Sequence, residues 1–245
     1  MQNPSTHSLN ITFGNKCKLY LFVQDEKRIQ AIAEECDSIL SWLGAPSGFT
    51  VYLWLIDWPR FLKADEWATR KNVNGGWAIP GINEIFVYRD EEWDRVLIHE
   101  TIHALKWDWE MPETPLPCWG FDTNDTLFPH LFEAWTELYA EWLWIGWHKL
   151  SWEKQRERQD MQALQVLARN NSEQWKEDTN IFAYYVLKAC LAPHIAFLLI
   201  FRNGSTENER NNVLCGLVTP RLNELKDRAK QINPVATTMR MTIEE

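Results

Sequence analysis

The sequence predicts an α+β fold, with a small mixed sheet and helices in the N-terminal half and helices alone in the C-terminal half. The short segments that we interpret as strands, rich in β-branched and aromatic residues, lie before residue 90, and long stretches of helical periodicity dominate after it. No internal repeat, low-complexity tract or Gly/Ser linker divides the chain. We therefore expect one domain over residues 1–245, with an α+β part over about 1–110 and a helical part over about 111–245.

The N-terminal half alternates between expected strands and expected helices. The strands are placed at 18–23, 49–56 and 82–88. A helical period begins at Asp25 and ends around residues 43–44. A second helix is expected from about 91 to 105, because Asp90 before it is a residue type that caps helix N-termini.

The C-terminal half contains three further expected helices. The first begins near residues 128–129 and runs past Trp144. The second spans about 181–201, and the third spans about 219–232. The apolar run 189–201 is too short to cross a bilayer, and charged or kinking residues (Lys188, Pro193 and His194) interrupt the longer stretch. We expect a buried, kinked core helix and no membrane span.

Composition and charge exclude several classes of protein. With 245 residues and 45% hydrophobic content, the chain is large enough to bury a sizeable core. The formal net charge of −9 argues against a nucleic-acid partner, which requires a basic surface. The N-terminus lacks the basic and apolar regions of a secretory signal, and the five cysteines are scattered. These features predict reduced thiols and an intracellular, cytoplasmic location.

Residues 99–103 read His-Glu-Thr-Ile-His, and this motif carries the strongest functional signal. On a helix, His99 and His103 lie on the same face, where two imidazoles can hold one Zn²⁺ ion. Glu100 then stands beside a zinc-activated water and can act as general base. The flanking residues are apolar, so three ionisable groups in this helix need a functional reason to be there. The motif predicts a zinc-dependent hydrolase.

A catalytic zinc requires three protein ligands and one open position. Lys106 stands where some HExxH enzymes have the glycine of a sharp turn, so we expect no such turn here and a third ligand from another helix. Glu133, Glu137 and Glu141 form a carboxylate row at i, i+4 and i+8 on a helix that is otherwise almost wholly apolar. Buried carboxylates need a metal ion or hydrogen bonds.

HExxH followed by Glu133-Ala134-Trp135-Thr136-Glu137 resembles the gluzincins, the thermolysin-like zinc metallopeptidases. The resemblance implies a zincin-like fold with an active-site cleft between its two parts, a peptide or protein substrate, Glu133 as third ligand, and Glu137 as the carboxylate that orients a ligand histidine. Phe132 replaces a common asparagine, and Glu137 is one methylene longer than aspartate. Glu137 therefore remains an alternative ligand.

The resemblance also implies a donor for the developing oxyanion and a peptide-binding strand. The candidate groups for the substrate or the transition state are Tyr184, Tyr185, Lys188 and His194, with Tyr139 behind them. Core packing is the competing interpretation for each, and Lys188 either binds a substrate carboxylate, as in a carboxypeptidase, or pairs with Glu141. The strand at 82–88 is expected to be the edge strand that pairs with peptide, beside Gly75 and Gly76. The stretch from residue 73 to residue 100 also resembles metallopeptidase-like proteins of large DNA viruses.

Two alternative functions are open at this point. A small-amide hydrolase of the deformylase type takes a cysteine ligand from an upstream strand, but Cys36 falls in an expected helix. A non-catalytic binding protein stabilised by zinc would need a fourth ligand, for which Glu137 or His130 is available. The retention of Glu100 favours catalysis, since this residue binds no metal in HExxH sites.

Overall fold

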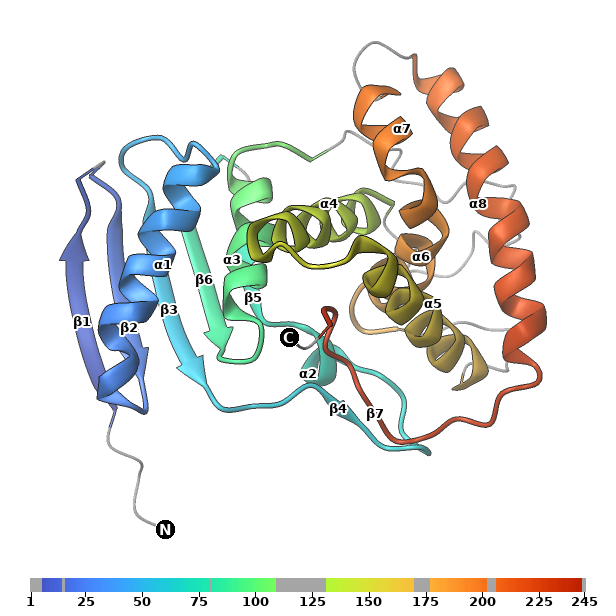
Figure 1. The fold of residues 1–245 in the computed structure, drawn as a ribbon, viewed down its shortest axis with the longest axis horizontal. Helices are drawn as coiled ribbons and strands as arrows, with labels where there is room; N and C mark the ends of the chain where they lie inside the picture. Colours follow the sequence, from blue (N-terminus) through green and yellow to red (C-terminus); the bar gives the residue numbers. More distant parts are fainter. Residues whose placement is uncertain are drawn as a thin grey trace. The chain divides into compact units, whose positions relative to one another are not determined.

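The computed structural model describes residues 6–14, 16–79, 81–108, 131–169, 177–201 and 206–243. The chain divides into two compact units, Met1–Pro59 with Gly75–Asp108 (unit 1) and Arg60–Asn74 with Trp109–Glu245 (unit 2). Unit 1 contains a sheet with helices and unit 2 is mainly helical, so the fold class is α+β, as predicted (Figure 1). The expected division near residue 110 lies close to the Asp108–Trp109 boundary, but the segment Arg60–Asn74 belongs with the helical unit.

Unit 1 is built on a five-stranded mixed sheet in the order β1-β2-β3-β6-β5. Its strands are β1 (His7–Thr12), β2 (Lys18–Val23), β3 (Thr50–Ile56), β5 (Gly76–Ala78) and β6 (Glu84–Arg89). The three central strands β2, β3 and β6 are parallel, and the two edge strands β1 and β5 run antiparallel to their neighbours. The expected strands at 18–23, 49–56 and 82–88 are therefore present, and β1 and β5 are additional.

Helices α1 (Ile29–Trp42) and α3 (Trp93–Ala104) cover one face of this sheet (Figure 1). The sheet residues that point toward them are buried hydrophobics: Leu19, Leu21, Val23, Val51, Leu53, Leu55, Ile85 and Val87. The residues that alternate with these are exposed or half-buried. This alternation is the pattern of a sheet packed on one side only.

Residues with left-handed backbone flank helix α3 on both sides. The N-cap is Glu92, with φ 60°, and not the predicted Asp90, which instead accepts two hydrogen bonds of 2.5 and 2.8 Å from Arg28. At the C-terminus the N–H of Trp107 donates to Ile102 and that of Lys106 donates to His103, both at 3.0 Å. This is a Schellman motif with Lys106 at φ 55°. The expectation that a non-glycine residue excludes a sharp turn here is wrong.

The described residues of unit 2 form helices and one short strand pair, β4 (Phe61–Leu62) with β7 (Thr237–Thr238). Its α-helices are α2 (Arg70–Val73), α4 (Leu131–His148), α5 (Trp152–Arg169), α6 (Lys188–Leu191), α7 (Ile195–Phe201) and α8 (Glu207–Ala229). The expected helix over 181–201 is divided by a π-helix at Phe182–Leu187 and a 3₁₀ turn at Ala192–His194, which contains Pro193. Helix α8 begins well before the predicted residue 219, and α5 was not predicted.

The apolar stretch of unit 2 forms much of its core. Among the described residues, Phe182–Phe201 is long and apolar enough to cross a membrane by length and composition, and 56% of its most apolar window is buried inside the protein. A core helix passes the same test. The absence of a membrane span stays a prediction.

The cysteines depart in part from the expected reduced thiols. Cys17, Cys36 and Cys190 are buried and in the reduced state, but Cys215 is disulfide-bonded. Cys118 lies outside the described residues. Disulfides are typical of oxidising compartments, so the predicted cytoplasmic location does not gain support from the cysteines.

Candidate metal centre

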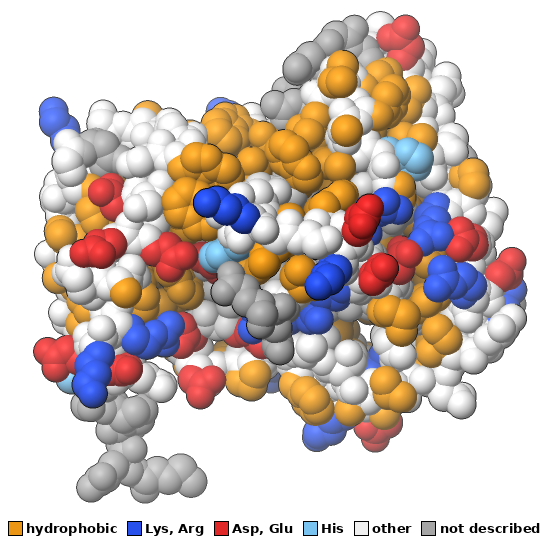
Figure 2. Space-filling view, in the orientation of Figure 1, with side chains coloured by type: hydrophobic (Ala, Val, Ile, Leu, Met, Phe, Trp, Pro, Cys, Tyr) orange, Lys and Arg blue, Asp and Glu red, His pale blue; other side chains and the backbone are white. Residues whose placement is uncertain are grey.

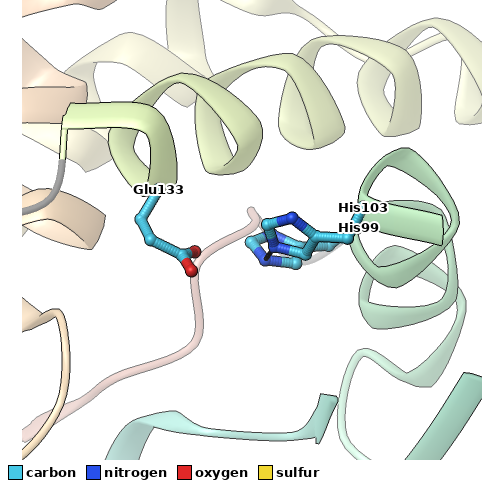
Figure 3. Close-up of side chains that lie close together, drawn as sticks. All are labelled: His99, His103 and Glu133. Atoms are coloured by element: carbon cyan, nitrogen blue, oxygen red, sulfur yellow. Dashed lines mark hydrogen bonds between the residues drawn. The ribbon is translucent and has the colours of Figure 1, made fainter. Parts of the chain in front are cut away.

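His99 and His103 project from one face of α3 and bring their Nε2 atoms to 3.0 Å from each other (Figure 3). Their rings meet edge to face, with centroids 4.7 Å apart. Two Zn–N bonds of about 2.0–2.1 Å at a tetrahedral angle would place the nitrogens roughly 3.3 Å apart. Both side chains are buried, at 6% and 8% relative exposure. The spacing of the motif thus produces the paired nitrogens that the sequence predicts.

Asp108 lies beside the other nitrogen of one of these rings. Its Oδ1 lies 3.0 Å from Nδ1 of His103. The left-handed turn at Lys106 reverses the chain immediately after α3 and returns Asp108 to the helix. A carboxylate on Nδ1 leaves Nε2 as the nitrogen that can bind a metal and fixes the orientation of the ring. Sequence reasoning assigned this kind of role to Glu137 and missed Asp108.

Glu100 lies on α3 directly beside strand β5. A Cβ atom placed on Gly76 would come within 3.2 Å of Cγ of Glu100, 2.7 Å of Cγ1 of Val96 and 2.6 Å of the carbonyl oxygen of Phe86. Only glycine permits this close approach of strand and helix. Glu100 is buried, at 6% relative exposure. The general-base candidate is therefore held against an edge strand of the sheet.

The carboxylate row on α4 has two buried members, Glu137 and Glu141, and one half-buried member, Glu133. The side chains of Glu137 and Glu141 are buried, at 2% and 0% relative exposure, whereas Glu133 in the first turn is half-buried. Lys188 Nζ forms an ion pair with Glu141 and lies 3.7 Å from Glu137. Gln155 and Gln159 on α5 also donate to Glu141. The two inner carboxylates thus belong to a buried charge cluster of unit 2.

The network around Lys188 decides between the two interpretations of that residue. Lys188 is fully buried, pairs with Glu141 and lies over the ring of Tyr185 at 5.6 Å. The pairing alternative is therefore the one observed. Tyr185 is also fully buried, and its hydroxyl donates to the carbonyl of Met239 at 2.7 Å. Both side chains are held inside unit 2, as the core-packing interpretation expects.

The remaining substrate candidates are more accessible. Tyr184 and His194 are half-buried, and Tyr139 stacks between Trp135 and Trp142 at 5.6 and 6.1 Å. Burial, together with the charge of Arg156, lowers the pKa of His194 below its ordinary value. His130 lies outside the described residues. The roles assigned to Tyr184 and His194 stay predictions.

Cys36 has none of the properties of a zinc ligand. It lies in α1, fully buried, and burial raises the pKa of its thiol. A metal-binding cysteine must be deprotonated, which this environment opposes. The structure gives no support to a deformylase-type ligand set built on this residue.

The segment expected to form the edge of the sheet is an interior strand. β6, at Glu84–Arg89, lies between β3 and β5, so the prediction that this segment forms the edge of the sheet is wrong. The edge beside α3 is β5, at Gly76–Ala78. Three residues containing a glycine carry too little periodicity to be recognised as a strand.

Charges on the surface show no concentration of one sign on the face that Figure 2 displays. Within each unit, acidic and basic side chains of the described residues are interspersed there. Hydrophobic side chains gather over α7, where Phe197 and Ile200 are 47% and 77% exposed. The chain has a net charge of −9. The absence of a nucleic-acid partner stays a prediction.

Comparisons of the chain with models of protein families, with curated proteins and with solved structures find no match.

Proposed function

We propose that this protein is a zinc-dependent metallopeptidase of zincin-like fold, with Glu100 as general base. One observation carries the proposal: two buried histidines one helical turn apart converge through their Nε2 atoms, at 3.0 Å, with a glutamate next to the first of them. A structural His pair would not require a buried carboxylate beside it, because burying an ionisable group is costly.

The donor set fits zinc. Imidazole nitrogens and a carboxylate are the ligands of catalytic zinc sites, and His103 has the carboxylate partner on its second nitrogen that such ligands commonly have. Three described residues have side chains of the kinds that bind zinc: His99, His103 and Glu133. The two histidines are buried and the glutamate is half-buried. We infer that Glu133 is the third ligand, because Glu137 and Glu141 already face Lys188.

Zinc at these residues would lower the pKa of a bound water toward 7 and polarise the substrate carbonyl. Glu100 takes the proton from the attacking water and transfers it to the leaving amine. Asp108 keeps the His103 ring in one tautomer throughout. Strand β5 offers backbone groups beside Glu100, where an extended peptide can pair as an additional strand.

Metal analysis together with a peptide-cleavage assay tests the proposal. The purified protein should hold about one zinc per chain, and His103→Ala should lose it. A peptide library should be cleaved, a chelator should abolish cleavage, and added Zn²⁺ should restore it. Zinc in the wild type without cleavage of any peptide would instead indicate a zinc-stabilised binding protein. Undiminished zinc in His103→Ala would contradict the site itself.

A further inference from the structure

A row of stacked aromatic rings crosses the sheet of unit 1 on the face opposite α1 and α3. Tyr20, Tyr52, Phe86 and Trp77 are register partners on β2, β3, β6 and β5. Consecutive ring centroids are 5.0, 4.4 and 4.0 Å apart, and the planes differ by 12°, 6° and 8°. Each inner ring therefore has both faces covered by its neighbours. We call these four residues the aromatic ladder.

The ladder ends at Trp77, on the edge strand. Phe86 covers one face of its indole, yet Trp77 is 47% exposed. The exposed area must come from the ring edge and from the outer face, on the side where no described strand pairs with β5. The ladder thus presents one open aromatic face at the margin of the sheet.

The backbone of β5 is oriented to extend the ladder by one more strand. The N–H of Tyr88 donates to the carbonyl of Gly75, at 2.9 Å. Because antiparallel partners alternate, Trp77 is also hydrogen-bonded to β6, and the N–H and C=O groups of Gly76 and Ala78 point away from the sheet. A peptide that pairs antiparallel with these outer groups places one residue opposite Trp77, in a non-hydrogen-bonded pair with Cα atoms about 4.5 Å apart.

We propose that Trp77 is a specificity-determining residue that selects peptide substrates with an aromatic side chain at the position opposite it. This inference rests on the proposed peptidase function. A residue paired with Trp77 turns its side chain to the ladder face, because register partners point to the same side of a sheet. A planar ring there stacks on the open indole face as the fifth ring of the row, at the spacing that separates the other four.

The place of Trp77 next to Gly76 on β5 determines how far the aromatic substrate residue lies from the cleaved bond. Gly76 adjoins Glu100, the proposed base, and Trp77 is its immediate neighbour along the strand. Each strand residue advances the chain by about 3.3 Å, so the aromatic residue should lie within about two positions of the scissile bond. The neighbouring substrate side chains point to the opposite face of the sheet, so only one position should show the preference.

A peptide library that varies each substrate position in turn tests the inference on the zinc-loaded full-length protein. At each position we compare kcat/KM for a peptide with an aromatic residue to kcat/KM for the same peptide with alanine. The wild type should show one aromatic preference within about two positions of the scissile bond. Trp77→Ala should reduce that ratio by about 2- to 10-fold, the range measured for aromatic pairs, and Trp77→Phe should retain most of it. Trp54→Ala is the matched control, because Trp54 is 60% exposed on the same face but stands outside the ladder on β3.

The outcomes separate this inference from the proposed function. Two results would overturn the role of Trp77 and leave the peptidase proposal intact. The first is cleavage without an aromatic preference near the scissile bond, and the second is an aromatic preference that survives in folded Trp77→Ala. An equal loss in Trp54→Ala also overturns it, since a general disturbance of the sheet would then be the cause. If the wild type cleaves no peptide in the library, the proposed function fails and this inference fails with it. Thermal unfolding of each variant shows whether it is folded.

Discussion

At the scale of single residues, Asp108 gives the histidine pair a defined chemical state. A neutral imidazole has one N–H, and the 3.0 Å distance between His103 Nδ1 and Asp108 Oδ1 favours the tautomer that carries this N–H on Nδ1, the nitrogen away from His99. The lone pair of His103 Nε2 is then available for a metal. The same contact limits rotation of the ring, which keeps the two nitrogens converging.

Asp108→Asn should therefore weaken zinc binding without removing it. The amide retains the shape but loses the charge that makes His103 a better ligand, and changes to such partners typically cost about 10–100-fold in metal affinity. Competition with a chromophoric zinc chelator measures the affinity. Glu137→Gln serves as the comparison, and a larger loss there than in Asp108→Asn would restore the role that the sequence assigned to Glu137.

The identity of the third ligand is a second residue-scale question. Glu133→Ala should lose most of the zinc affinity, whereas Glu137→Ala should mainly lower stability, because Glu137 lies 3.7 Å from buried Lys188. Zinc content after dialysis and thermal unfolding of the metal-free proteins separate the two effects. If Glu137→Ala strips the metal and Glu133→Ala retains it, the two roles are exchanged.

At the scale of elements, the close contact of β5 with α3 depends on one glycine. Gly76→Ala would put a Cβ atom 2.6 Å from a backbone oxygen and 2.7 Å from Val96, distances that require the strand or the helix to move. Such overpacking costs about 1–3 kcal/mol, so unfolding of the metal-free variant should begin at lower denaturant concentration. Gly14→Ala, with nothing within 4 Å of the added atom, should change stability by under about 0.5 kcal/mol. Equal effects of the two changes would contradict this packing.

Elements with a strong period were predictable, and those whose residues depend on distant partners were not. β2, β3 and β6 alternate, and α3 carries an apolar surface between its ionisable residues, so their positions could be inferred from the sequence. Helix α5 buries glutamines, including Gln155 and Gln159, against the charged cluster of α4. Its residues 153–160 are all polar, so this part of the helix has no apolar periodicity to detect. The edge strand β5 was too short to show alternation.

In the candidate site, too, contacts set by local geometry were predictable and contacts that depend on distant residues were not. The pairing of His99 with His103 follows from helical geometry alone, because i and i+4 share a face in any helix. The contact of Asp108 with His103 depends on a left-handed residue at Lys106, a conformation that lysine rarely adopts, and propensity predicts against it. The burial of Lys188 against Glu141 was one of two alternatives that only tertiary structure could separate.

At the scale of the whole molecule, a metal bound only by the folded chain should add to stability. At a zinc concentration about 100-fold above Kd, linkage predicts roughly 2.7 kcal/mol. For a chain of 245 residues this corresponds to a rise in Tm of about 5–10 °C. Thermal unfolding with chelator and with added Zn²⁺ measures the shift. His99→Ala should show almost none, and a full shift in that variant would place the bound zinc elsewhere.

The central claim is that Glu100 supplies the base for peptide hydrolysis, and the most direct test is the cleavage rate of Glu100→Gln at a zinc content equal to that of the wild type. The change is nearly isosteric and removes only the proton acceptor, so the variant should keep its metal and its fold. We predict that its turnover falls by about two to four orders of magnitude. Wild-type cleavage that persists undiminished in zinc-loaded Glu100→Gln would show that another group is the base and would contradict this account.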